Sequence, residues 1–84
     1  MRLVPNPAED QVTAYIDLGQ GVEGAVLVEV QDAVGRTVQR RSVLLAPEQS
    51  SIVLDVSGLF SGTYTVAINH ASSARVLRAQ LVKR

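Results

Sequence analysis

The sequence predicts an all-β protein, specifically a seven-stranded immunoglobulin-like antiparallel β-sandwich. Apolar residues alternate with polar ones at a period of two in several windows, which is typical of half-buried strands. Turn-forming residues interrupt these windows at intervals of roughly ten residues, as in sandwiches of short antiparallel strands. The chain is 46% hydrophobic and 19% charged, which is too apolar for a disordered segment, and its 84 residues suffice for one domain.

Seven strands are expected along the chain. Their predicted ranges are 2–4, 11–18, 24–31, 36–45, 50–56, 63–69 and 74–83. The second is the clearest, because apolar residues recur at every other position from residue 12 to residue 18. Four later strands repeat the pattern, with the predicted inner rows Val26, Val28 and Val30; Ile52, Leu54 and Val56; Tyr64, Val66 and Ile68; and Leu77, Ala79 and Leu81.

The fourth strand is the least regular. Its apolar residues change phase between Val38 and Val43, which predicts a bulge or an exposed edge strand. Arg40 and Arg41 lie between the two phases. Paired arginines on an edge would discourage unwanted addition of another strand.

Asp32, Ala33, Val34 and Gly35 predict a tight hairpin between the third and fourth strands. Asp32 suits the first position of a type I turn, and Gly35 suits the left-handed position that rejoins the ladder through a bulge. Arg36 follows directly. We expect it to be a solvated cation or to add a surface contact.

The run from Leu59 through Gly62 to Tyr64 is typical of a tyrosine corner. In this feature a tyrosine at the start of a strand bonds back to the preceding connection, and the leucine closes the end of the core.

At the other end of the chain, Pro5, Asn6 and Pro7 predict an extended entry that follows a flexible linker. Pro5 and Pro7 lack backbone N–H groups, which limits pairing beside the first strand.

Charge is distributed unevenly although the formal total is zero. Residues 1–35 contain one arginine and six carboxylates, whereas residues 36–84 contain seven lysines or arginines and two carboxylates. We expect acidic strands from the first part to pair with basic strands from the second. A surface that attracts a charged partner is the alternative.

Residues that would support catalysis or metal binding are missing or isolated. The chain has no cysteine, and His70 is its only histidine. No serine lies in a G-x-S-x-G elbow, and no zinc, calcium or phosphate-binding spacing occurs. The neutral total and the lack of interleaved aromatic residues argue against nucleic-acid binding. We therefore expect no enzyme activity, no cofactor and no metal.

We expect neither a membrane-spanning segment nor a signal peptide within these residues. The sequence has no run of about 18 apolar residues that could insert into a membrane and no apolar segment typical of a signal peptide. We interpret residues 1–84 as a single domain that belongs to a longer protein.

Several short sequence features occur in a characteristic order over residues 3–84. They are Pro5, Asn6 and Pro7 after Leu3; Asp32, Gly35 and Arg36; Leu54, Asp55, Ser57, Leu59, Gly62, Tyr64 and Val66; and Leu77, Leu81, Val82 and Lys83. In this order the chain resembles the type A C-terminal sorting domain of the bacterial type IX, or Por, secretion system. Val4 departs from the pattern, since the family usually has an aromatic residue there.

The resemblance implies a non-catalytic secretion signal of a Bacteroidetes-type bacterium. Its partners would be the type IX outer-membrane translocon, a surface sortase and a parent cargo domain on its N-terminal side. The parent would pass through the periplasm to the outer-membrane surface or the extracellular space. The sortase would cut before Leu3 and attach the cargo to the cell surface or release it. No oligomeric state is implied.

Sorting signals of this family concentrate in the last strand, so we expect residues 75–84 to be recognised. A terminal edge strand offers backbone groups to which a partner can add a strand. Leu77 and Leu81 would anchor this strand inward, whereas Val76, Val82 and Lys83 would face the partner.

An immunoglobulin- or fibronectin-like accessory module for adhesion or carbohydrate binding is the alternative, because it would share the fold without the sorting role. A sugar-binding module needs an aromatic platform. Tyr15, Phe60 and Tyr64, the only aromatic residues, form no obvious platform in the sequence.

Overall fold

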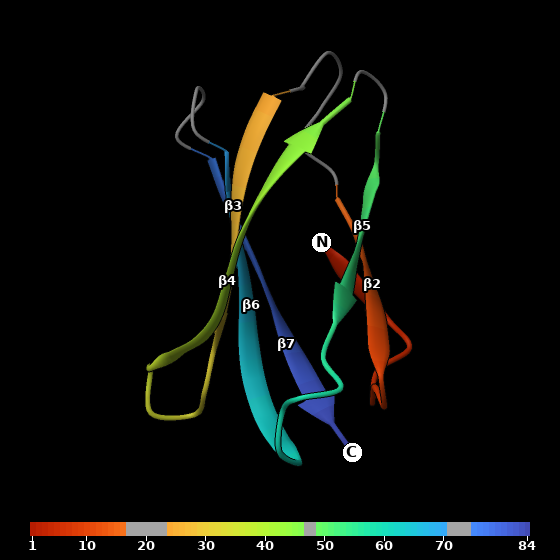
Figure 1. Ribbon diagram of the computed structural model, residues 1–84, viewed down its shortest axis with the longest axis vertical. Coiled ribbons are helices and arrows are strands. Elements are labelled where there is room, and N and C mark those ends of the chain that lie inside the picture. Colours follow the sequence, from red (N-terminus) through yellow and green to blue (C-terminus); the bar gives the residue numbers. More distant parts are fainter. Residues whose placement is uncertain (17–23, 47–48, 71–74) are drawn as a thin grey trace.

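The computed structural model describes residues 1–16, 24–46, 49–70 and 75–84, and these form two antiparallel sheets packed as a sandwich (Figure 1). The strands are β1 (Arg2–Val4), β2 (Gln11–Tyr15), β3 (Gly24–Gln31), β4 (Thr37–Leu45), β5 (Ser51–Asp55), β6 (Gly62–His70) and β7 (Arg75–Lys83). One sheet has the order β1-β2-β5 and the other the order β4-β3-β6-β7. The predicted seven-stranded all-β sandwich is confirmed.

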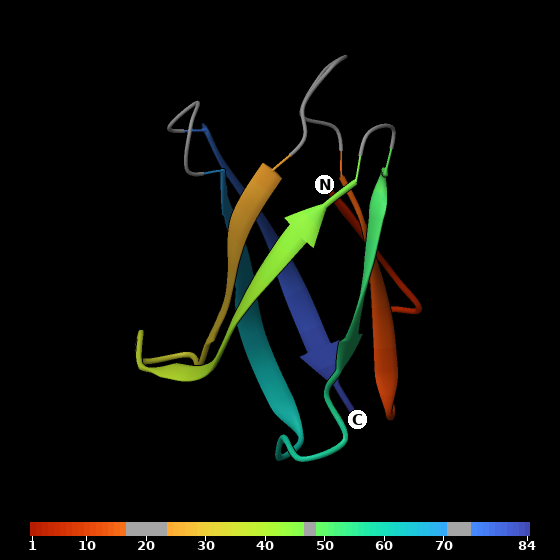
Figure 2. The ribbon, with the colours of Figure 1, turned by 45° about the horizontal axis from the view of Figure 1, so that its top comes forward.

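The order of the strands places the first strand next to the last. The hairpins β3–β4 and β6–β7 lie within the larger sheet, and the chain changes sheet after β2, β4 and β5. Figure 2 shows β7, in blue, passing behind β4 and ending near the lower end of β5. β1 contacts β7 although the two strands belong to different sheets. The connection from β1 to β2 contains cis peptide bonds before Pro5 and Pro7.

Alternating apolar residues from both sheets fill the core, as the period of two predicted. The residues with almost no exposed surface include Val12, Ala14, Val26, Val28, Val30, Ile52, Leu54, Val56, Val66, Ile68 and Leu81. Leu59, Leu77 and Ala79 are partly buried against them. Burial of this apolar surface is the main stabilising contribution in a chain without disulfides.

The predicted ends of some strands differ from the structure. β2 ends at Tyr15, and residues 17 and 18 of the predicted strand lie outside the described residues. His70 was expected to begin a loop, but it ends β6, where it pairs with Val26 and Arg75 and is buried. The connections that the predicted strand ranges leave at residues 19–23 and 71–73 lie outside the described residues.

β4 is an edge strand with an irregular register, as its change of phase predicted. Its pairing with β3 shifts between Val30 and Gln31. On the outer face, Arg40 forms an ion pair with Glu29 at 3.1 Å. The expected pairing of acidic and basic strands is therefore present between β3 and β4, where an exposed pair contributes only modestly to stability.

Candidate functional site

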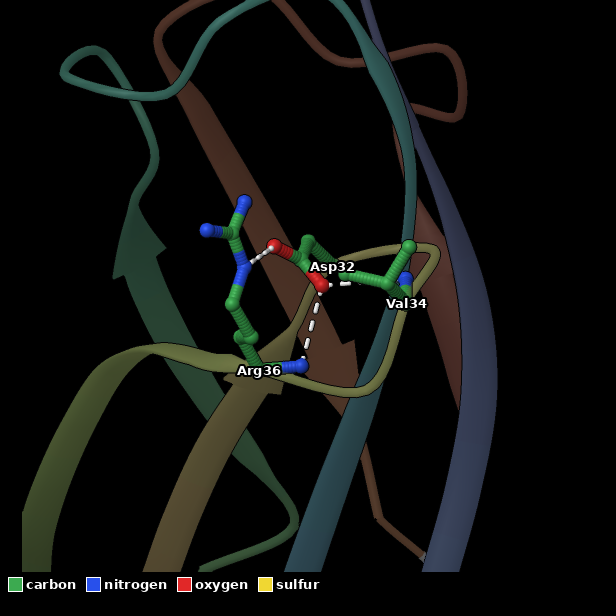
Figure 3. A network of polar contacts seen from close by, with 3 residues as sticks. All are labelled: Asp32, Val34 and Arg36. Carbon is green, nitrogen blue, oxygen red and sulfur yellow. Dashed lines mark hydrogen bonds and ion pairs between the residues drawn. The ribbon is translucent and has the colours of Figure 1, made fainter.

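The β3–β4 turn is organised by the carboxylate of Asp32 (Figure 3). Its Oδ1 atom accepts the backbone N–H groups of Val34 at 3.0 Å and Arg36 at 2.9 Å, and its Oδ2 atom accepts the Arg36 Nε–H at 2.9 Å. Gly35 has φ = 88° and its amide donates to the Asp32 carbonyl at 3.0 Å. The predicted turn is confirmed, and Arg36 is ion-paired rather than simply solvated, although its side chain is 79% exposed.

Hydrogen bonds favour the ionised form of two carboxyl groups near the ends of strands. The Arg36 backbone N–H is the main cause that lowers the pKa of Asp32 below its ordinary value of 3.8. At the end of β5, the Ser57 hydroxyl lowers the pKa of Asp55 in the same way, through a 2.7 Å hydrogen bond. Both carboxylates thus stabilise loop geometry.

Tyr64 forms the predicted tyrosine corner. Its hydroxyl donates to the Phe60 carbonyl at 2.6 Å, and its side chain is buried in the core. Leu59 packs against the core from the same connection, while Gly62 begins β6. These residues therefore have an architectural role in joining β5 to β6.

The connection between β1 and β2 lies along the outer edge of β7. The Ala8 amide donates to the Val82 carbonyl at 2.8 Å, and the Ala8 carbonyl accepts from the Arg84 amide at 2.9 Å. These bonds form a parallel bridge between Ala8 and Lys83, and Ala8 is fully buried. The sequence pattern does not predict this contact.

Asn6 extends the contact with its side chain. The carboxamide oxygen accepts the Val82 amide hydrogen at 2.8 Å, and the carboxamide nitrogen donates to the Gln80 carbonyl at 2.9 Å. Pro5 and Pro7 cannot donate backbone hydrogen bonds, whereas a carboxamide carries both a donor and an acceptor. Asn6 therefore contacts β7 as a residue of a neighbouring strand would. A carboxamide between two prolines was the only sequence signal for this role.

The side chains of β7 alternate between the core and the outer face. Leu81 is fully buried and Leu77 is partly buried, whereas Val76 and Val82 are each 40% exposed. The expectation that Lys83 faces outward is wrong, because this residue is only 9% exposed and shares the inward phase of Leu81. Its Nζ atom donates to the Arg84 carbonyl at 2.9 Å.

Part of the outer edge of β7 remains open. The hydrogen bonds to Gln80 and Val82 show that the backbone groups of these residues point away from β6. Alternate residues of an antiparallel strand point the same way, so the N–H and C=O groups of Val76 and Arg78 also point to this edge. Within the described parts of the chain, no side chain or backbone group bonds to them there.

The edge of β5, in contrast, is covered by side chains. Its carbonyls accept hydrogen bonds from three side-chain donors: Ser51 from Gln49 at 3.0 Å, Val53 from Arg41 at 3.4 Å, and Asp55 from Gln39 at 2.9 Å. Gln39 and Arg41 belong to β4 in the other sheet. Arg41 thus protects the edge of β5 rather than only its own edge, which makes strand addition there unfavourable.

The described residues contain no group of three or more acidic or histidine side chains able to hold a metal ion. The exposed aromatic residues do not form a sugar platform either. Tyr15 pairs with Ser51 at the start of β5, Phe60 lies beyond the other end of β5, and Tyr64 is buried. Over the residues described, no helix is long and apolar enough to cross a membrane.

The strands form a small immunoglobulin-like sandwich in which part of the backbone edge of β7 is exposed. A family model described as a secretion system C-terminal sorting domain matches residues 2–83. The chain belongs to this family and is a sorting signal of type IX, or Por, secretion. Domains of this family are in general non-catalytic, and they imply export to the cell surface or the extracellular space.

A solved structure supports the fold. The chain is similar to part of PorZ, described as an essential bacterial surface component of the type-IX secretion system of Porphyromonas gingivalis, with a TM-score of 0.71 and 20% sequence identity. The match covers 99% of this chain and 11% of the PorZ chain, so this chain corresponds to about a tenth of PorZ. No curated protein matches the sequence.

Proposed function

We propose that residues 1–84 form one C-terminal sorting domain that directs a cargo protein, joined to its N-terminal side, through the type IX outer-membrane translocon. The cargo passes from the periplasm to the outer-membrane surface or the medium. β7 is the recognised strand, and a component of the translocon adds a strand of its own to the free edge of β7.

The observation that carries this proposal is the open edge at Val76 and Arg78. Strand addition needs unpaired backbone donors and acceptors, and these two residues supply them. The edge of β5 is less able to accept an added strand, because side chains already bond to its carbonyls. β7 also contains arginines but no carboxylate, so a partner strand with acidic side chains fits it best.

The structure also supports the proposed place of sortase cleavage. Leu3 is 6% exposed and pairs with Ala14, so the backbone of β1 is held within a sheet. Peptidases cleave extended, accessible segments more readily than paired strands. The sortase therefore cuts on the N-terminal side of β1, and the cargo is attached or released while the domain stays folded.

Arg78→Pro tests recognition of the β7 edge. Proline removes the outward N–H of residue 78 and leaves the bonds between β7 and β6 in place, since those bonds belong to the alternate residues. The variant and the parent domain are each fused behind a signal peptide and a fluorescent cargo in a type IX-competent strain. We expect cell-surface or secreted fluorescence to fall several-fold for Arg78→Pro.

Arg78→Gln is the matched control, because it removes the charge and keeps the N–H group. Thermal unfolding of the purified domains verifies that both variants fold. Wild-type export of a folded Arg78→Pro fusion would refute strand addition at this edge. Deleting residues 81–84 is a less direct test, because Leu81 lies in the core.

A further inference from the structure

The connection from β1 to β2 occupies the same kind of backbone groups on β7 that a partner strand would need. Asn6 and Ala8 engage the carbonyl of Gln80, both backbone groups of Val82 and the amide of Arg84. This covers the C-terminal half of the β7 edge. The connection leaves the backbone groups of Val76 and Arg78, in the N-terminal half of this edge, uncovered.

This internal contact is suited to being displaced. The hydrogen bonds of Asn6 are exposed, and Pro5 and Pro7 have no amides with which to strengthen the pairing. Ala8 alone is fully buried, and its side chain is small. By comparison, the neighbouring strand β6 pairs with β7 over its whole length, from Gly62 to His70.

We propose that residues 5–8 form an edge latch on the recognised strand. In the free domain the latch protects the C-terminal half of β7 from accidental strand addition. A strand of the export machinery binds first at Val76 and Arg78 and then extends along β7 by displacing Asn6 and Ala8. This inference rests on the proposed recognition of β7 and adds how that recognition is regulated.

The latch has a quantitative consequence. When only a fraction of molecules has an open edge, the apparent affinity of a partner is reduced by that fraction. Weakening the latch should therefore increase recognition, whereas weakening an ordinary structural contact should leave recognition unchanged or reduce it.

Asn6→Ala tests the latch in the isolated domain. Residue-resolved hydrogen exchange measures the amide of Val82, which bonds to Asn6, and the amide of Leu81, whose partner strand is β6. We expect exchange at Val82 to accelerate about tenfold or more, with little change at Leu81. Asn69→Ala, on the outer face of β6, is the matched control. Unchanged protection of Val82 would overturn the latch.

Export of the cargo fusion supplies the second measurement. At low expression, the Asn6→Ala fusion should be exported faster than the parent fusion, and the Asn69→Ala fusion at the parent rate. If Asn6→Ala does not fold, Asn6→Asp replaces it, because the carboxylate keeps the acceptor for Val82 and loses the donor to Gln80. Unchanged or slower export by a folded Asn6→Ala variant, or by a folded Asn6→Asp variant that has lost the bond to Gln80, would overturn the proposal.

The two proposals fail in different ways. Wild-type export of the Arg78→Pro fusion would refute the proposed recognition of β7, independently of the results for the latch. Loss of export by Arg78→Pro together with unaltered export by Asn6→Ala would support recognition of β7 and refute the proposed latch.

Discussion

The side chain of Asn6 holds the backbone amide of Val82, with 2.8 Å between the carboxamide oxygen and the amide nitrogen. These residues are separated by 76 positions in the sequence, and the contact joins the segment after β1 to the last strand. The Pro-Asn-Pro segment is therefore more than an extended entry. It closes one half of an edge that would otherwise attract other strands.

Tyr64→Phe should destabilise the domain by about 1 kcal/mol, because it leaves the Phe60 carbonyl without its 2.6 Å hydrogen bond. Urea unfolding at neutral pH measures the difference. Tyr15→Phe is the control, since Tyr15 is 43% exposed and its ring keeps its contact with Arg2. Equal free energies of unfolding for the two variants would show that the corner hydrogen bond contributes nothing.

Gly35→Ala should cost about 1–2 kcal/mol, because an L-residue at φ = 88° is strained. A Cβ atom at this position meets no atom within 4 Å, so the loss reports backbone conformation and not a clash. Gly58→Ala also enters open space but needs no positive φ. We expect Gly58→Ala to change the unfolding free energy much less; a similar loss for both glycines would contradict this explanation.

Asp32 should make stability depend on pH. Its pKa is lowered in the folded protein, so the stabilisation is present above the unfolded value of about 3.8 and is lost as the pH falls through the lower folded value. Asp32→Asn should be less stable than the parent at pH 7, and the difference between the two urea midpoints should shrink as the pH falls below 3.8. A difference that stays constant over this range would mean that ionisation of Asp32 is not responsible.

Leu81→Ala should destabilise the domain by about 2–5 kcal/mol, because it removes a fully buried side chain from the core. Val82→Ala, one residue further, should change stability by no more than about 0.5 kcal/mol, since Val82 is on the outer face. Calorimetric melting of both variants checks this. Comparable losses of stability in the two variants would contradict the alternation of buried and exposed side chains along β7. An export defect of a Leu81 variant therefore has to be compared with its loss of folded protein.

The sequence by itself determined most of the fold, because strand pattern and turn chemistry are local. Alternation placed the inner rows of the strands, and Asp32 and Gly35 specified the β3–β4 turn through bonds within five residues of chain. The spacing from Phe60 to Tyr64 likewise specified the corner. The inward direction of Lys83 was also within reach of the sequence, since it continues the phase of Leu81.

Only the tertiary structure decided which edges of the sandwich are open. Asn6 meets Gln80 and Val82 because the two sheets pack face to face, which places the edge strands β1 and β7 next to each other. Arg41 reaches the carbonyl of Val53 across the sandwich for the same reason. Such contacts depend on how the sheets are placed relative to each other, and strand periodicity contains no information on that placement. The last strand was predictable as an element, whereas the limits of its accessible edge were not.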